Sequence, residues 1–111
     1  MAEVRRNVIT PITADESCHT VADAADVIRH QAADAITIKI GKAGGLYPSK
    51  KIADVAQAFG MGVRVDGIPG DTRLTTTAAA CLVSNLRSVL GAGVMQHRHL
   101  KEDIVQAGGH V

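Results

Sequence analysis

Aromatic side chains are almost missing from this chain of 111 residues, which has one Phe, one Tyr and no Trp. Its apolar residues, 46% of the chain, are therefore mainly Ala, Val, Ile and Leu. Small aliphatic side chains suit helices that pack on a sheet, as in α/β proteins. The length corresponds to one small domain or to part of a larger one. We expect one partial domain over residues 1–111.

Cysteine is also scarce, since Cys18 and Cys81 are the only two. They are too few for a disulfide scaffold and lack the spacing of metal ligands, so we interpret them as reduced thiols. The first ten residues, MAEVRRNVIT, contain no apolar segment typical of a signal peptide. No apolar run is long enough to span a bilayer. These absences predict a cytoplasmic protein without a membrane partner.

An excess of charge of either sign is the third thing that the sequence lacks. Twelve Lys and Arg residues balance eleven Asp and Glu residues, for a formal net charge of +1. Acidic and basic residues are interspersed along the chain, so no basic patch favours nucleic acid or an anionic membrane. We therefore expect no nucleic-acid partner.

Strand and helix patterns alternate along the chain. After the end of a helix at residues 2–7, we expect strands at 11–17, 35–40, 61–67 and 88–95. The expected helices are at 20–31, 48–60 and 73–85, and the chain beyond 95 is expected to be a loop or a short helix. Such alternation predicts a parallel sheet with right-handed crossovers. An eight-stranded barrel needs about 250 residues, so the predicted fold is α/β, a half β/α TIM-type barrel with about four parallel strands.

The segment AITIKIGKAGG, residues 35–45, is the most informative of these strands. We expect Ile36, Ile38 and Ile40 on one face, with Thr37 and Lys39 on the other, followed by a glycine turn. In a β/α barrel one face of each strand packs on helices and the other faces the interior. Lys39 is therefore predicted inside the barrel, near the strand end where such barrels keep their active sites.

Polar residues follow the same alternation on three successive strands. Near their carboxyl ends, the inward residues are predicted to be Asp15, Lys39 and Asp66. A carboxylate suits Mg²⁺, and partial burial can lower the pKa of a lysine enough to make it a base. A metal and a lysine base together can remove a proton α to a carboxylate.

Two other interpretations of Lys39 remain open at this point. Asp15 and Lys39 can form a structural ion pair, since such networks also shift pKa values. Lys39 can also be a Schiff-base lysine, as in aldolase barrels, although a paired Asp15 argues against that chemistry.

Three segments carry a resemblance to a known family. They are residues 11–17 (PITADES), 33–45 (ADAITIKIGKAGG) and 52–62 (IADVAQAFGMG). Together they resemble the C-terminal barrel half of the mandelate racemase/muconate lactonizing enzyme branch of the enolase superfamily, closer to the lactonizing side. The resemblance extends from Pro11 to about Asp103.

The resemblance implies an activity and a set of site residues. Asp15 matches a Mg²⁺ ligand, and Lys39, 24 residues later, matches an acid/base lysine. Glu16 would be a partner of that ligand, or the ligand itself on the mandelate racemase pattern. Asp66 falls near the catalytic histidine of mandelate racemase-like members. The implied reactions are racemization, epimerization, cycloisomerization or dehydration of a small carboxylate through an enolate.

This sequence also departs from the family pattern. The capping domain, the paired-lysine strand and the first two metal ligands have no counterpart in it. The glutamate that lactonizing enzymes carry on their last strand falls at about Gly93, within GAGVMQH. We therefore expect the chain alone to be inactive. The alternative function is a non-catalytic half-barrel that self-associates or binds a partner or small ligand.

Half a barrel leaves two sheet edges and an inner face open, which invites association. We expect either a homo-oligomer, such as two copies closing one barrel by twofold symmetry, or a complementing barrel half. A monomeric mass in light scattering at micromolar concentration would contradict this expectation.

Overall fold

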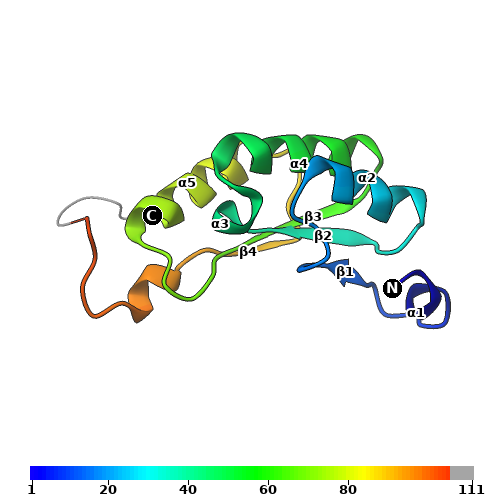
Figure 1. The fold of residues 1–111 in the computed structure, drawn as a ribbon, viewed down its shortest axis with the longest axis horizontal. Coiled ribbons are helices and arrows are strands. Elements are labelled where there is room, and N and C mark those ends of the chain that lie inside the picture. Colours follow the sequence, from blue (N-terminus) through cyan, green and yellow to red (C-terminus); the bar gives the residue numbers. More distant parts are fainter. Residues whose placement is uncertain (106–111) are drawn as a thin grey trace.

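The computed structural model describes residues 1–105, which form one sheet with helices on one of its faces (Figure 1). In chain order the elements are α1 (Ala2–Arg6), β1 (Thr13–Ala14), α2 (Val21–Arg29), β2 (Ala35–Ile38), α3 (Ile40–Ala43), α4 (Leu46–Ala58), β3 (Gly62–Asp66), α5 (Arg73–Ser84), β4 (Gly91–Gly93) and the 3-10 helix η1 (Gln96–His99). No helix in these 105 residues combines the length and apolar character needed to cross a membrane.

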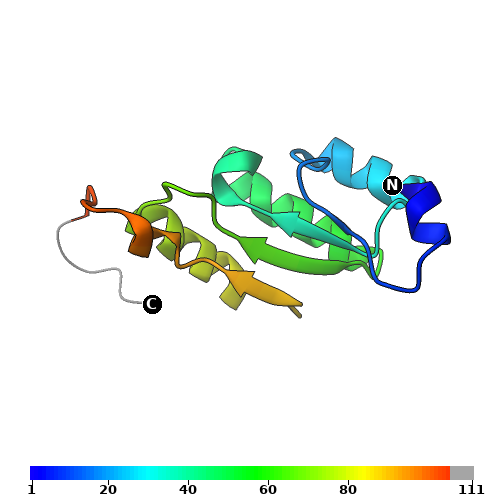
Figure 2. The same cartoon turned by 90° about the horizontal axis from the view of Figure 1, so that it is seen from below.

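All four strands are parallel and lie in the order of the sequence, β1-β2-β3-β4. Ala14 pairs with Ile36, and Ile38 pairs with Val65, so the strands end at the same edge of the sheet. Helices α2, α4 and α5 cover one face, and the opposite face is seen uncovered in Figure 2. The predicted α/β architecture, with four parallel strands alternating with helices, is confirmed.

The core lies between the sheet and its helices. On β2 and β3 it contains Ile36, Ile38, Val63 and Val65, each at most 2% exposed. They pack in one cluster with apolar residues of the helices, including Ile52 of α4. The predicted alternation is therefore confirmed for these strands, because their apolar side chains face the helices. Burying such aliphatic side chains is the main stabilising contribution to this fold.

The end of β2 differs from the sequence prediction. The strand stops at Ile38, and α3 begins at Ile40, where we expected the strand to continue. Gly44 ends this short helix with φ +85°, and the N–H of Gly45 donates to the carbonyl of Ile40 at 2.9 Å. Glycine tolerates such a left-handed conformation because it has no Cβ. The predicted glycine turn is thus the carboxyl end of a helical turn.

Other element ends shift by a few residues. β1 is shorter than predicted, and α4 begins at Leu46, so that Pro48 lies in its first turn rather than at its start. Proline is tolerated there because the first N–H groups of a helix have no intrahelical partner. Gly60 follows α4 with φ +72° and ends it as predicted.

The start of α2 provides the first testable prediction. Thr20 accepts a hydrogen bond from the N–H of Asp23, and the Asp23 carboxylate accepts one from the N–H of Thr20, forming a capping box. We expect Thr20→Ala to lower the free energy of unfolding by about 0.5–2 kcal/mol in urea titrations, because an N-terminal donor loses its partner.

Thr72 provides a matched control for that substitution. It occupies the same position before α5, but its side chain makes no capping hydrogen bond. Instead, the Asp103 carboxylate accepts a hydrogen bond from the N–H of Arg73 at 2.8 Å. The N-terminal hydrogen bond of α5 is therefore supplied by a side chain 30 positions away from Arg73, not by Thr72. Equal losses in Thr20→Ala and Thr72→Ala would contradict the capping argument.

The segment after β4 forms the short helix η1, in agreement with the loop or short helix expected beyond residue 95. The Nδ1 atom of His97 lies 3.0 Å from the hydroxyl oxygen of Thr76, which is buried in α5. His97 therefore joins η1 to the helical layer, and among residues 1–105 no group of three metal-binding side chains includes it.

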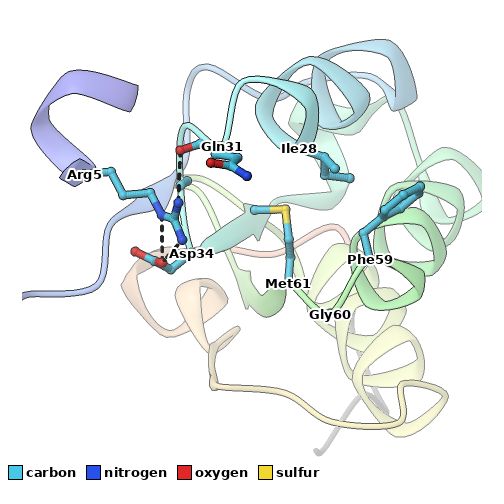
Figure 3. Close-up of a pocket in the computed structure, with 8 residues that line it drawn as sticks. Arg5, Ile28, Gln31, Asp34, Phe59, Gly60 and Met61 are labelled. Atoms are coloured by element: carbon cyan, nitrogen blue, oxygen red, sulfur yellow. Dashed lines mark hydrogen bonds and ion pairs between the residues drawn. The ribbon is translucent and has the colours of Figure 1, made fainter.

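A pocket of about 530 Å³ lies near the amino ends of β2 and β3, at the opposite end of the sheet from Lys39 (Figure 3). On one side of it, Arg5 of α1 forms an ion pair with Asp34 at 2.7 Å and donates to the carbonyl of Gln31. Phe59 and Met61 lie on the other side. The pocket's charged groups are thus already paired with each other, and they attach α1 to the sheet.

Asp34 gives a pH-dependent prediction. Its hydrogen bonds from Arg5 and from the N–H of Ile12 hold the pKa of Asp34 below the ordinary value of 3.8. A lowered folded-state pKa stabilises the protein above the unfolded-state value, and this stabilisation is lost as the pH falls through the folded-state pKa. We expect Asp34→Asn to be less stable than the wild type at pH 7, and the difference in the free energy of unfolding to shrink as the pH falls below 3.8, measured by urea unfolding. A constant difference across this range would contradict the assignment.

Candidate active site

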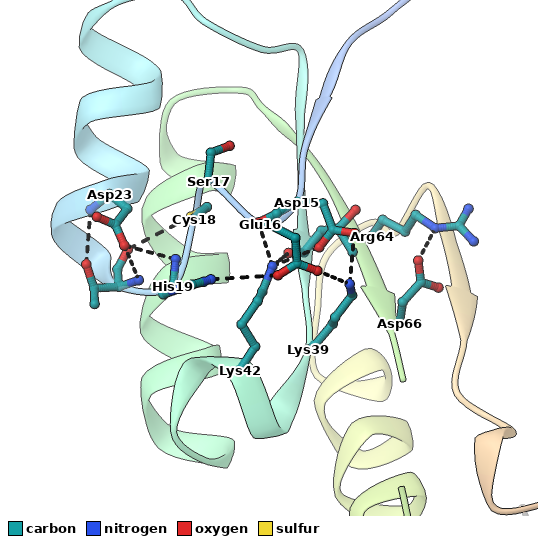
Figure 4. Close-up of polar contacts among 12 residues, drawn as sticks. Asp15, Glu16, Ser17, Cys18, His19, Asp23, Lys39, Lys42, Arg64 and Asp66 are labelled. Atoms are coloured by element: carbon teal, nitrogen blue, oxygen red, sulfur yellow. Dashed lines mark hydrogen bonds and ion pairs between the residues drawn. The ribbon is translucent and has the colours of Figure 1, made fainter. Parts of the chain in front are cut away.

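Lys39 lies directly after β2, between the strand and α3, with its side chain 14% exposed. Its ammonium group contacts the Asp15 carboxylate at 2.9 Å and the Glu16 carboxylate at 2.6 Å (Figure 4). Both acidic residues follow β1, which pairs with β2. Because parallel strands end at the same edge of a sheet, the residues after β1 and β2 come within contact distance. The predicted meeting of Asp15 and Lys39 is observed.

Lys42 belongs to the same cluster, although the sequence pattern does not predict a role for it. Its side chain is only 8% exposed, and its ammonium group contacts a carboxylate oxygen of Asp15 at 2.8 Å. It also donates to the main-chain carbonyls of Asp15 and Thr37, at 2.5 and 3.3 Å. The available signal was its position three residues after Lys39, which becomes informative only once α3 is known to be a helix.

Burial and the two lysines shift the pKa of Asp15 in opposite directions. Partial burial raises the pKa of Asp15, but the hydrogen bonds and charges of Lys42 and Lys39 outweigh it, and the pKa lies below 3.8. The hydrogen bond from Lys39 likewise lowers the pKa of Glu16, which lies on the surface. Both carboxylates are therefore ionised at neutral pH.

The direction of the Lys39 shift corrects the sequence prediction. We expected burial to lower the pKa of this lysine, but hydrogen bonds to Glu16 and Asp15 raise it above 10.5, and burial opposes them only in part. An ammonium group beside two carboxylates is stabilised in its charged form. In this arrangement Lys39 is an acid, and it becomes a base only when its contacts with the carboxylates weaken.

Asp66 lies on the same sheet face but not in the same cluster. It follows Val65, which pairs with Ile38, so Asp66 is level with Lys39 on the neighbouring strand. Its carboxylate is instead bonded by Nε of Arg64 at 2.6 Å. The remaining oxygen, Oδ1, is buried without a hydrogen-bond partner among the described residues. The three predicted inward residues thus form two separate groups, Asp15 with Lys39 and Asp66 with Arg64.

Asp15 and Glu16 are the residues of this cluster that suit Mg²⁺, because it prefers hard oxygen ligands. They are adjacent in sequence, and Lys39 bridges their carboxylates. No group of three His, Cys, Asp or Glu side chains with metal-binding geometry occurs in residues 1–105. The pair therefore fits a contribution to a Mg²⁺ site but does not make a complete one.

Comparison with known proteins identifies the family. A family model described as enolase C-terminal domain-like matches residues 1–111. The chain belongs to the enolase C-terminal domain-like family. The mandelate racemase/muconate lactonizing resemblance and the barrel-half fold predicted from the sequence are thereby confirmed.

Two relatives of this chain are an epimerase and a cycloisomerase. The L-Ala-D/L-Glu epimerase of Bacillus subtilis is 37% identical over 99 residues, which are 89% of this chain and 27% of the epimerase. The chloromuconate cycloisomerase of Cupriavidus pinatubonensis is 31% identical over 107 residues, which are 96% of this chain and 28% of that enzyme. The chain thus spans little more than a quarter of the length of these relatives.

A solved structure extends the similarity to the fold. The dipeptide epimerase of Enterococcus faecalis, in a complex with Mg and the dipeptide L-Leu-L-Tyr, superposes with a TM-score of 0.88 at 30% identity. The match covers 95% of this chain and 30% of the epimerase. The four parallel strands and their helices therefore have the arrangement of one part of an enolase-superfamily enzyme.

Proposed function

We propose that this chain contributes part of an active site that removes the α-proton of a small carboxylic acid, in a racemase, epimerase, cycloisomerase or dehydratase. The observation that carries the proposal is the cluster of Lys39, Asp15 and Glu16 at the carboxyl ends of β1 and β2. Barrel enzymes have their active sites at that edge. The isomerase-type relatives support the same reaction class.

Each side chain has a distinct task in this proposal. Asp15 and Glu16 present the oxygens that would hold Mg²⁺, and Lys42 keeps the Asp15 carboxylate in place from the opposite side. Mg²⁺ held there would supply positive charge next to the carboxylate of a substrate acid. Lys39 exchanges the α-proton as acid and base. Lys39 can act as a base only as the neutral amine. Weaker contacts with Asp15 and Glu16 would lower the pKa of Lys39 and so favour the neutral amine.

The proposal also specifies what must be added to this chain. A Mg²⁺ ion takes about six oxygen ligands, and the described cluster supplies two carboxylates. We infer that a complementing barrel half, or a second copy of the chain, provides the rest, and that the chain alone is inactive. A cytoplasmic location is part of the same proposal.

The alternative function is a non-catalytic half-barrel that associates with itself or with a partner. One observation favours it: Lys39 and Lys42 are fully engaged in ion pairs, as they would be in a structural cluster. In that case the charges stabilise the strand ends and exchange no substrate proton.

Deuterium exchange distinguishes the two functions. The complete protein, meaning this chain together with the barrel half or second copy that completes the site, is incubated in D₂O with candidate acids, such as dipeptides and N-acyl amino acids. Deuterium at the α-carbon is followed by NMR. We expect exchange with Mg²⁺, none after chelation with EDTA, and none by residues 1–111 when they are monomeric. Absence of exchange in every arm would support the non-catalytic alternative.

A further inference from the structure

Arg64 lies in the middle of β3, on the sheet face that the helices leave uncovered, where it pairs with Thr37 of β2 and Gly91 of β4. Its side chain is 47% exposed, and its Nε atom donates to Asp66 at 2.6 Å. Arg64 has no role in the proposed proton exchange by Lys39. Lys39 follows β2, the strand next to β3, on the same sheet face, so Arg64 lies one strand away from the proposed acid and base.

Two glycines of β4 make room for this pair of side chains. A Cβ atom at Gly91 would lie 3.2 Å from Nη1 of Arg64, and a Cβ at Gly93 would lie 2.5 Å from Oδ1 of Asp66. The second distance is too short for any side chain unless Asp66 moves. The Arg64 and Asp66 side chains therefore occupy the space over β4 that larger residues at Gly91 and Gly93 would fill.

Most donors of Arg64 remain available to a ligand. The Asp66 contact uses Nε, and among residues 1–105 neither Nη1 nor Nη2 donates a hydrogen bond. Lys39 and Lys42 differ, since two and three oxygen-bearing groups already engage their ammonium groups. The paired Nη atoms of a guanidinium form a planar fork that matches the two oxygens of a carboxylate.

We propose that Arg64 is a specificity-determining residue that binds, through Nη1 and Nη2, a second carboxylate of the substrate, distant from the reacting carbon. The preferred substrates would then be acids with two anionic groups. This inference rests on the proposed function, because it assumes that the face carrying Lys39 receives the substrate.

Asp66 acts as a positioning residue in this arrangement. Its Oδ2 holds the guanidinium by Nε, and its Oδ1 is packed against Gly93 and buried. The pair is therefore held by packing over β4 as well as by charge. A fixed guanidinium loses less conformational freedom when it binds an anion than a free arginine side chain does.

The test compares two ligands that differ in one charge. Glutarate has two carboxylates, whereas its monoamide, glutaramate, replaces one of them with a neutral group of the same shape. Calorimetry on the complete protein, with Mg²⁺ and at fixed ionic strength, measures both affinities. We expect the wild type to prefer glutarate by about 10- to 100-fold, as for a charge-assisted carboxylate contact. Arg64→Met should remove the preference.

Two further variants make the test specific. Arg64→Lys keeps the charge but not the fork, so we expect a preference between those of the wild type and Arg64→Met. Arg29→Met removes an arginine that is also paired with an aspartate, Asp26, but lies on the exposed face of α2. It should retain the full preference. If Arg64→Met does not fold, as judged by circular dichroism, Arg64→Lys alone decides the result.

A wild type without preference for glutarate, or a preference that is undiminished in every Arg64 variant that folds, would overturn the inference. The deuterium exchange assay is independent of this measurement. Exchange that continues with no Arg64-dependent preference overturns the role of Arg64 and leaves the proposed function intact. An Arg64-dependent preference without any exchange supports the anion site and contradicts the catalytic proposal.

Discussion

Lys39→Ala is expected to lower the rate of α-proton exchange in the complete protein by about 10²- to 10⁴-fold, the usual contribution of a positioned acid or base. Alanine cannot exchange a proton, and it also leaves Asp15 and Glu16 without the ammonium group that they share. NMR measurement of deuterium at the α-carbon of the substrate gives this rate directly.

Lys51→Ala is the matched control for Lys39. Lys51 is an exposed lysine of α4 whose ammonium group lies 4.5 Å from the centre of the Tyr47 ring, on the helical layer. We expect its removal to leave the exchange rate unchanged within about twofold, because surface substitutions away from a site are usually near neutral. Equal exchange by the wild type and Lys39→Ala would exclude catalysis through Lys39.

Ile36→Ala is expected to lower the free energy of unfolding by about 2–5 kcal/mol, as for other large-to-small substitutions in a core. Ile36 is 0% exposed and lies in β2, between β1 and β3. Its removal leaves a cavity between the sheet and the helical layer. Urea unfolding followed by circular dichroism measures the loss in free energy of unfolding. The substitution also affects Lys39, because β2 positions that residue.

Ile9→Ala removes the same atoms from a fully exposed isoleucine in the segment before β1. We expect a change within about 0.5 kcal/mol, because no buried contact is lost. If both alanine variants were equally destabilised, the core assignment of Ile36 would be wrong.

Strand patterns were predictable because their signal is local. Alternation along AITI and VRV places Ile36, Ile38, Val63 and Val65 on one face, and the structure buries all four. The Thr20 capping box is equally local, since both of its partners lie within four residues of each other. Parallel pairing then follows from the alternation of strands and helices.

Helix α3 was not predictable in the same way. Its four residues, IGKA, include a glycine and a β-branched residue, and both disfavour a helix. Tertiary contacts override these preferences: Ile40 is buried in the core, and Lys42 is held by Asp15 and the carbonyl of Thr37. The direction of the Lys39 pKa shift depends on these same neighbours, so the sequence pattern alone led to the wrong sign.

The sequence by itself determined which side chains share the inner face of the sheet, because alternation and parallel pairing place Asp15, Lys39 and Asp66 there. Only the tertiary structure decided how they are paired, because side-chain contacts depend on distances of a few ångströms across strands. It joined Lys39 to both Asp15 and Glu16 and raised its pKa. It also placed Asp66 with Arg64, over the space that Gly93 leaves free.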